Sequence, residues 1–323
     1  MNKKADAIII GAGVIGSSVA FELAKRGYKT LNIDKLPTSG YGSTSNSCAI
    51  VRAHYSTWDG VAMAYEGFFY WDDWANYLGV EDERGMIKYM KTGSIMFKLQ
   101  GEDHSKKSLK FFEEIGVEHE IWDLEKLKER MPIYSHAQFD GTTRPDDDEH
   151  FFDKTGKKIE GAIFTPGSGY VSDPQLSSHN LQVAAEANGG EFLFNNEIKE
   201  IRQEDGKVLG VSLKTGEQID APIVVNVAGP HSFVINRMAG VEEEMNIKTK
   251  ALRHEVHHVP SPEGFDFEKD GFHTSDGDNY IYFRPETGNT ILIGSEDPLC
   301  DPKEWIEDPD NYNNQLTGTQ WRA

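Results

Sequence analysis

The sequence predicts an α/β fold, α+β overall, and its length of 323 residues suits two domains. A short apolar strand over residues 7–10 is followed at once by a glycine-rich turn and an amphipathic helix. A second apolar strand over residues 30–33 ends at an acidic residue. A third apolar strand, over residues 223–227, ends at a glycine. These observations favour buried parallel strands with helical connections.

Residues 11–16 carry the pattern G-x-G-x-x-G. Gly11 allows the tight turn, Gly13 lets the backbone approach a pyrophosphate, and Gly16 lets the helix pack on the strand. The helix N-terminus offers unpaired N–H groups and partial positive charge to phosphates, and Asp34 can accept hydrogen bonds from a ribose. Because strand, turn, helix, strand and acid occur together, the unit predicts a Rossmann-like dinucleotide site.

Composition narrows the class of protein further. The chain has 33 basic and 53 acidic residues and a formal net charge of −20, which disfavours nucleic acids and anionic membranes as partners. Cys48 and Cys300 are too few for a disulfide framework, and no apolar run approaches the roughly 20 residues that span a bilayer. With no signal peptide expected, these features predict a cytoplasmic protein.

Two further stretches have an ordinary structural explanation. Residues 61–78 place an aromatic stripe on a predicted helix, which is typical of core packing. Residues 136–159 contain consecutive carboxylates at 146–149, which repel one another and favour a solvated surface loop over a metal site. No metal site is therefore expected.

Five segments, taken in order, resemble the D-amino-acid-oxidase-like family of FAD-dependent oxidoreductases. Within that family the sarcosine and dimethylglycine oxidase or dehydrogenase branch is the most similar. The segments are residues 11–16 with Asp34, residues 42–52, residues 167–174, residues 224–230, and residues 282–286 with 291–294. They cover nearly the whole chain, and their order is more specific than any one of them.

The resemblance implies a discontinuous FAD-binding domain over residues 1–85 and 160–240. The remaining residues, 86–159 and 241–323, would form a substrate domain with a mainly antiparallel sheet over the flavin. The residues implied to bind FAD are Gly11, Gly13, Val14, Ile15, Gly16, Asp34, Lys35, Gly42, Ser43, Thr44, Ile198, Ala228 and Gly229. Non-covalent binding is expected, because about Asn46 stands where dimethylglycine dehydrogenases carry a flavin-linking histidine.

The family's reaction removes a hydride from the carbon beside an amine nitrogen, and electrons then pass to oxygen or to a carrier protein. The implied substrate is a small N-methylated amino acid, whose carboxylate suits a guanidinium. Arg52 is the first candidate for that role, although binding to loop carbonyls is an equal alternative. Tyr282 and Tyr280 would form a substrate-facing wall or pack within the sheet. Arg284 would bind a carboxylate or brace Glu286.

The sequence also departs from the family pattern. Ser45 and Ala49 stand where monomeric sarcosine oxidases carry a catalytic histidine and a second arginine. Residues 297–323 show no strand–glycine–helix pattern, so the chain is expected to be shortened. The alternative is therefore a truncated or degenerate flavin-binding protein without independent turnover. An NAD-linked dehydrogenase would use the same glycine turn, but the later segments argue against it.

Residues 254–258 match the zinc-protease pattern H-E-x-x-H. That pattern binds metal only on a helix, where positions four apart share a face. Pro260 follows directly, and the family resemblance places the segment on a strand, where the two histidines would be roughly 13 Å apart. We therefore do not expect zinc there.

Overall fold

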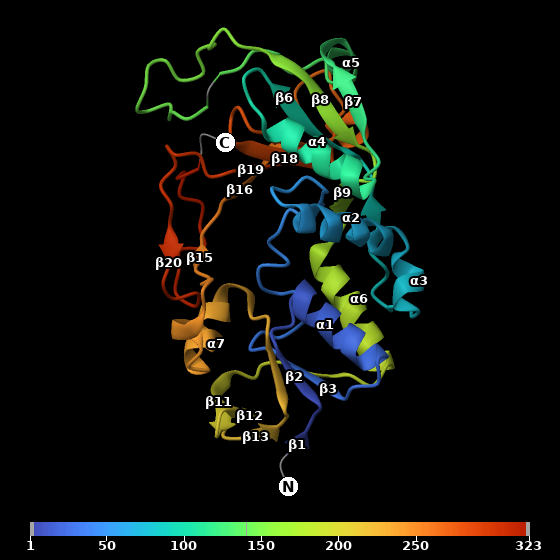
Figure 1. Cartoon of the computed structure of the whole chain (residues 1–323), viewed down its shortest axis with the longest axis vertical. Helices are drawn as coiled ribbons and strands as arrows, with labels where there is room; N and C mark the ends of the chain where they lie inside the picture. The colour runs from blue at the N-terminus through green and yellow to red at the C-terminus, as the bar shows by residue number, and fades with distance from the viewer. Residues whose placement is uncertain (1–2, 140, 321–323) are drawn as a thin grey trace.

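The computed structural model describes residues 3–139 and 141–320. The molecule is elongated, with a parallel sheet and its helices in the lower half of Figure 1 and a large, mostly antiparallel sheet in the upper half. Within the described ranges no helix combines the length and apolar character that crossing a membrane requires.

The lower half is built on four parallel strands. Their order across the sheet is β10 (Glu191–Leu193), β3 (Thr30–Ile33), β2 (Ala7–Ile10) and β14 (Ile223–Asn226). Strand β2 is wholly buried, because α1 (Val14–Lys25) and α6 (Pro174–Ala187) pack together over the sheet. Helix α6 begins where the Asp173 side chain accepts the Leu176 N–H at 2.9 Å. The predicted strand–turn–helix–strand unit is confirmed.

A second small sheet packs beneath the parallel one. Its order is β1 (Lys3–Lys4), β13 (Gln218–Asp220), β12 (Lys207–Leu213) and β11 (Ile198–Glu204). Ile8 and Leu31 of the parallel sheet share one buried cluster with Val211 and Leu213 of this sheet. The chain leaves β14 through the short helices η1 (Gly229–His231), α7 (Ser232–Met238) and η2 (Glu242–Glu244).

The upper half is a seven-stranded sheet with helices α4 (His104–Ile115), α5 (Leu124–Arg130) and α8 (Phe267–Asp270) around it. Its order is β16 (Val256–Pro260), β19 (Thr290–Ser295), β18 (Ile281–Glu286), β17 (His273–Asp276), β6 (Ser94–Leu99), β8 (Ile159–Thr165) and β7 (Glu120–Asp123). Every neighbouring pair is antiparallel except β17 with β6. The predicted mainly antiparallel second sheet is therefore confirmed.

A three-stranded sheet lies at the junction of the two halves. Its strands are β4 (Ile50–Val51), β9 (Gly169–Val171) and β5 (Tyr89–Met90). Beside it run α2 (Trp58–Asp72) and α3 (Trp74–Leu78), and Phe68 and Trp74 from the predicted aromatic stripe are buried. Strand β8 belongs to the upper sheet, although the predicted boundary at residue 160 assigns it to the FAD-binding part. We propose that the boundary falls after β8.

The last described residues run down one side of the molecule, where β20 (Trp305–Ile306) pairs with β15 (Ala251–Leu252). Arg253 anchors this segment from a nearly buried position. Its guanidinium donates to the carboxylates of Glu255 at 2.8 Å and Glu304 at 3.0 Å, and to the backbone oxygen of Asn313 at 2.7 Å. One buried cation thus holds three parts of the chain together.

Candidate functional site

Two positions of the glycine turn, residues 11 and 16, have room only for glycine. Gly11 has a φ of +107°, and a Cβ there would lie 2.5 Å from the Val227 oxygen. A Cβ on Gly16 would lie 1.8 Å from the Gly11 oxygen. Gly13 is less crowded, since its Cβ would meet only the Thr44 hydroxyl, at 3.0 Å. The turn therefore packs β2, α1 and the segment after β14 at backbone distance.

The predicted acid lies directly beside this turn. Asp34 accepts the Ala12 N–H through Oδ2 at 2.6 Å and the Leu36 N–H through Oδ1 at 2.8 Å. From the other side, the Thr44 hydroxyl accepts the Val14 N–H at 3.1 Å. Two segments that are 20 to 30 residues away in sequence thus meet at the N-terminus of α1.

The other residues predicted to bind the cofactor surround the same end of the parallel sheet or lie close to it. Ile15, on the first turn of α1, is 64% exposed although it is apolar. Ala228 and Gly229 follow β14 directly, and Gly42 and Ser43 precede Thr44 in its turn. Ile198 begins β11, with its side chain buried in the lower core.

Lys35 makes contacts that its position after Asp34 did not predict. Its Nζ lies 2.8 Å from His231 Nε2 and also pairs with the Asp310 carboxylate. His231 Nε2 lies 3.0 Å from the same carboxylate. The segment that Arg253 anchors therefore reaches the edge of the glycine-turn region.

These features fit a dinucleotide cofactor. A turn that leaves no room for a Cβ at Gly11 or Gly16, a helix N-terminus aimed at it and a carboxylate beside it are what a pyrophosphate and a ribose need. The exposed apolar side chain of Ile15 at the same point adds a surface that a bound cofactor would cover.

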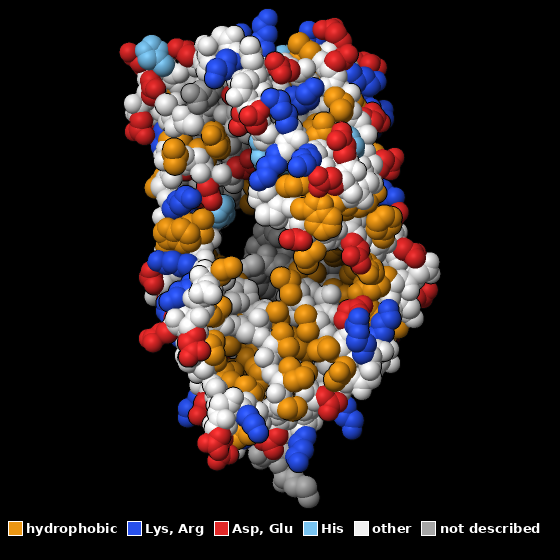
Figure 2. Space-filling view, in the orientation of Figure 1, with side chains coloured by type: hydrophobic (Ala, Val, Ile, Leu, Met, Phe, Trp, Pro, Cys, Tyr) orange, Lys and Arg blue, Asp and Glu red, His pale blue; other side chains and the backbone are white. Residues whose placement is uncertain are grey.

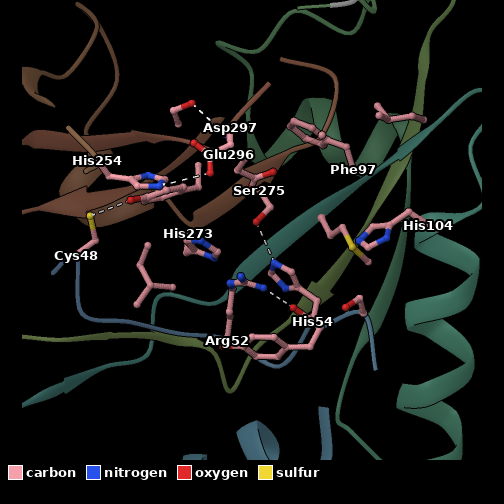
Figure 3. Close-up of a pocket in the computed structure, with 18 of the residues that line it drawn as sticks. Cys48, Arg52, His54, Phe97, His104, His254, His273, Ser275, Glu296 and Asp297 are labelled. Carbon is pink, nitrogen blue, oxygen red and sulfur yellow. Dashed lines mark hydrogen bonds and ion pairs between the residues drawn. The ribbon is translucent and has the colours of Figure 1, made fainter. Parts of the chain in front are cut away.

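A cavity of about 700 Å³ lies at the junction of the two halves. Loop residues 47–56 form one wall, and β6, β17 and the segment after β19 form the others (Figure 3). Figure 2 shows the molecular surface deeply hollowed between the upper and lower halves. The volume falls in the range of small-molecule binding sites.

Arg52 is the one lysine or arginine among the described residues that line this cavity. Its Nη1 donates to the His54 backbone oxygen, and its guanidinium stacks 4.6 Å from the centre of the Tyr55 ring. The alternative in which Arg52 binds a loop carbonyl is thus observed. The same guanidinium also lines the cavity, where a substrate carboxylate could reach it. No carboxylate in the described part of the chain forms an ion pair with it.

Of the two candidate tyrosines, only Tyr282 is among the residues that line the cavity. Tyr282 lines the cavity, where its hydroxyl lies 3.7 Å from Cys48 Sγ, and burial raises the pKa of its phenol. Tyr280 lies outside the cavity lining, is 37% exposed and has a positive φ of 54°. The predicted role of Tyr280 in a substrate-facing wall therefore has no geometric support.

Arg284 braces the upper sheet and does not line the cavity. It donates to the Cys48 oxygen at 2.6 Å, to the Pro285 oxygen at 2.6 Å and to the Glu286 carboxylate at 2.9 Å. Its guanidinium also lies 4.0 Å from the centre of the Tyr170 ring. Of its two predicted roles, the brace on Glu286 is the one observed, so we do not carry Arg284 into the candidate site.

Two buried histidines that sequence reasoning did not single out lie at the back of the cavity. The rings of His54 and His273 stack with centroids 5.7 Å apart. His54 Nε2 lies 3.0 Å from the Ser275 hydroxyl, and His273 Nδ1 lies 2.7 Å from the Ser94 hydroxyl. Burial lowers the pKa of both, that of His273 to about 3, so both are neutral at physiological pH.

Acidic side chains that were also missed follow β19. Burial raises the pKa of Glu296, against the opposing effects of a hydrogen bond with Ser275 and the positive charge of Arg52. Asp297 forms an ion pair with His254 at 3.4 Å. The available signal was their position just after Gly294, at the end of the last segment that carries the family resemblance.

The H-E-x-x-H residues do not converge. Val256–Pro260 is strand β16, as predicted, and its His258 bonds the Thr290 hydroxyl while His254 pairs with Asp297. Across residues 3–139 and 141–320 no cluster of three or more potential ligands can hold a metal. The expectation that this pattern does not bind zinc stays a prediction.

Comparison with known proteins defines the class. Residues 6–320 match the model of the family described as FAD dependent oxidoreductase, DAO, and the chain belongs to that family. The FAD cofactor and the resemblance to its sarcosine-oxidase-like members are thereby supported, as is the assignment to oxidoreductases.

Individual relatives are distant. The mouse (Mus musculus) mitochondrial pyruvate dehydrogenase phosphatase regulatory subunit is 24% identical over 91% of this chain and 30% of its own length. Sarcosine oxidase subunit beta of Rhodobacter capsulatus is 25% identical over 78% of this chain and 55% of its own length. The chain thus spans about half or less of these relatives. The structure of L-proline dehydrogenase from P. horikoshii shares the fold, with a TM-score of 0.76 at 20% identity over 100% of this chain and 75% of that one.

Proposed function

We propose that this chain is an FAD-dependent oxidoreductase that oxidises the C–N bond of a small N-methylated, secondary or tertiary amino acid, similar to sarcosine or dimethylglycine. The observation that carries the proposal is Arg52, which presents a guanidinium without an acidic partner in a cavity of about 700 Å³. An unpaired guanidinium in a partly buried site is suited to a substrate carboxylate. The family membership supplies the reaction class.

FAD supplies the hydride acceptor when it is bound. The glycine turn and the N-terminus of α1 would hold its diphosphate, and Asp34 would exchange its backbone partners for ribose hydroxyls. Arg52 would orient the substrate through its carboxylate, so that the carbon beside nitrogen faces the cofactor. The neutral His54–His273 pair and Tyr282 would form a wall that takes up no proton and leaves little room for water.

The proposal also covers the electron acceptor, the partners and the cellular location of the protein. Oxygen or an electron-carrier protein would accept the electrons from the reduced cofactor. A net charge of −20 argues against nucleic acid and anionic membrane partners, and a sequence with only two cysteines suits a reducing cytoplasm.

A visible absorption spectrum tests the proposal. Protein purified with FAD is expected to show flavin bands that bleach when sarcosine or dimethylglycine is added without oxygen, and NAD is expected to leave the spectrum unchanged. The matched control compound is N-methylethylamine, which has a secondary amine and no carboxylate and is expected to bleach the bands far more slowly. Bands that persist with every amino acid tried would contradict the proposed reaction.

The second candidate is a flavin-binding protein without independent turnover. The observation that favours it is the mouse relative, whose name describes a regulatory subunit rather than an enzyme. Under this alternative, the protein binds FAD with the same glycine turn, and amino acids leave its absorption unchanged. The bleaching experiment therefore separates the two candidates.

A further inference from the structure

The cavity carries one guanidinium and three carboxylates that are not paired with it. Glu102, Glu296 and Asp297 line the cavity together with Arg52. Within the described ranges, no ion pair joins Arg52 to any of them. A cation and an anion that share a cavity without touching leave a gap in which a dipolar molecule can bind to both.

The three carboxylates differ in how firmly they are placed. Asp297 is engaged by His254 at 3.4 Å. Glu102 lies in the exposed loop after β6, and among residues 3–139 and 141–320 no hydrogen bond or ion pair fixes its carboxylate. Glu296 lines the cavity beside Ser275, with which its carboxylate shares a hydrogen bond.

A second contact fixes Ser275 in turn. Its hydroxyl lies 3.0 Å from Nε2 of His54, and the His54 ring stacks on His273. Figure 3 shows Glu296 near Ser275 and Arg52 near His54. The chain His54–Ser275–Glu296 therefore sets a carboxylate at a defined place across the cavity from the guanidinium.

We propose that Glu296 binds the nitrogen end of the substrate while Arg52 binds its carboxylate, which makes Glu296 a specificity-determining residue. This inference rests on the proposed function and deepens it. The substrate class becomes amino acids with one carboxylate and one amine nitrogen whose N-substituents carry no negative charge. The nitrogen would bind as an ammonium and give its proton to the Glu296 carboxylate before the hydride leaves the neighbouring carbon. A second carboxylate on the substrate would meet Glu102, Glu296 and Asp297 and be repelled.

Two compounds without an α-hydrogen test the contact independently of turnover. 2-Aminoisobutyrate and pivalate have the same shape and carboxylate, but an ammonium in the first replaces a methyl group in the second. Calorimetric titration of the FAD-loaded protein is expected to show about 10-fold or greater preference for 2-aminoisobutyrate. Glu296→Gln is expected to abolish this preference and leave pivalate binding unchanged or tighter. Arg52→Gln is expected to weaken both compounds.

Two further variants guard against a trivial result. Glu102→Gln removes another cavity carboxylate and is expected to keep most of the preference, whereas an equal loss in Glu102→Gln and Glu296→Gln would overturn the inference. Ser275→Ala keeps the Glu296 carboxylate but removes its hydrogen bond, and it is expected to lower the preference a few-fold (about 3-fold). Because Ser275→Ala changes only a hydroxyl, it also tests the inference if Glu296→Gln fails to fold.

The outcomes distinguish this inference from the proposed function. A Glu296-dependent preference in protein whose flavin no amino acid bleaches would overturn the proposed function and support Glu296 as an ammonium site. Bleaching by sarcosine without any preference for 2-aminoisobutyrate would overturn the inference alone. Wild-type protein that binds neither compound would overturn the inference, and the proposed function would fall with it only if no amino acid bleached the flavin.

Discussion

The glycine-turn region and the cavity are built from different parts of the polypeptide. In the first, the backbone does nearly everything: a Cβ on Gly11 or Gly16 would collide with main-chain oxygens, and Asp34 bonds main-chain N–H groups. In the second, the chemistry depends on side chains from separate segments, such as Arg52 just after β4 and Glu296 just after β19. Backbone sites tolerate almost no substitution, whereas side-chain sites lose one interaction at a time.

The largest expected effect is at the backbone site. Gly16→Ala would place a Cβ 1.8 Å from the Gly11 oxygen, so the turn must shift. We expect a loss of about 3 kcal/mol in the free energy of unfolding and loss of FAD retention. Urea denaturation and flavin absorbance measure the two. The control is Gly67→Ala, whose Cβ meets nothing within 4 Å in α2 and which is expected to be neutral or stabilising.

The cavity is expected to respond more selectively. Arg52→Gln should lower kcat/KM for flavin reduction by dimethylglycine about 100-fold, because a charge-assisted contact to the carboxylate is lost. FAD affinity and thermal stability should change little. Equal activity in the variant would show that Arg52 serves only the His54 carbonyl.

The buried histidines make the stability of the upper half depend on pH. The pKa of His273 is about 3 in the folded chain against an ordinary 6.5, because burial and the charges of Arg52 and Arg284 oppose protonation. The unfolded chain therefore binds more protons between these values, so stability is highest above pH 6.5 and falls as pH falls. At pH 5 this amounts to about 2 kcal/mol.

Urea denaturation at pH 8 and pH 5 measures this effect. His273→Gln is expected to show a smaller loss of stability between the two pH values, because glutamine does not titrate. His54, with a pKa lowered in the same direction, retains part of the dependence. An identical pH dependence in the wild type and the variant would contradict the prediction.

The smallest effect is expected at the two tyrosines. Tyr282→Phe removes only a hydroxyl 3.7 Å from Cys48 Sγ and should cost less than about 1 kcal/mol in unfolding free energy and a few-fold, about 3-fold, in flavin reduction rate. Tyr280→Phe lies outside the cavity lining and should change neither quantity. A larger effect of Tyr280→Phe on the reduction rate would mean that Tyr280 reaches the substrate.

The difference between the regions also explains what the sequence could predict. The glycine turn, Asp34 and the start of α6 at Asp173-Pro174 are local patterns whose physics acts within a few residues. The cavity brings together Arg52, Ser275 and Glu296 through pairing of β17, β18 and β19 and the path of the loop at 47–56. Nothing local fixes where those side chains point.

Arg284 is a second case in which the sequence could not predict what a side chain contacts. A guanidinium on a strand can bind a ligand or satisfy neighbouring oxygens, and the sequence is identical in both cases. The three acceptors of Arg284 come from Glu286, the adjacent Pro285 and the distant Cys48, and only folding brings Cys48 close. The predicted domain boundary at residue 160 likewise could not take account of the pairing of β8 with β6 and β7, because that pairing is non-local.

The small sheet of β4, β9 and β5 limits how the polypeptide can be divided into fragments. Its strands come from residues 50–51, 89–90 and 169–171, so the polypeptide passes between upper and lower halves repeatedly. No single cut in the backbone frees either half as an intact fragment. Dividing the gene between the codons for residues 33 and 191 would place β2 and β3 on one polypeptide and β10 and β14 on the other, so the two must reassociate to rebuild the parallel sheet.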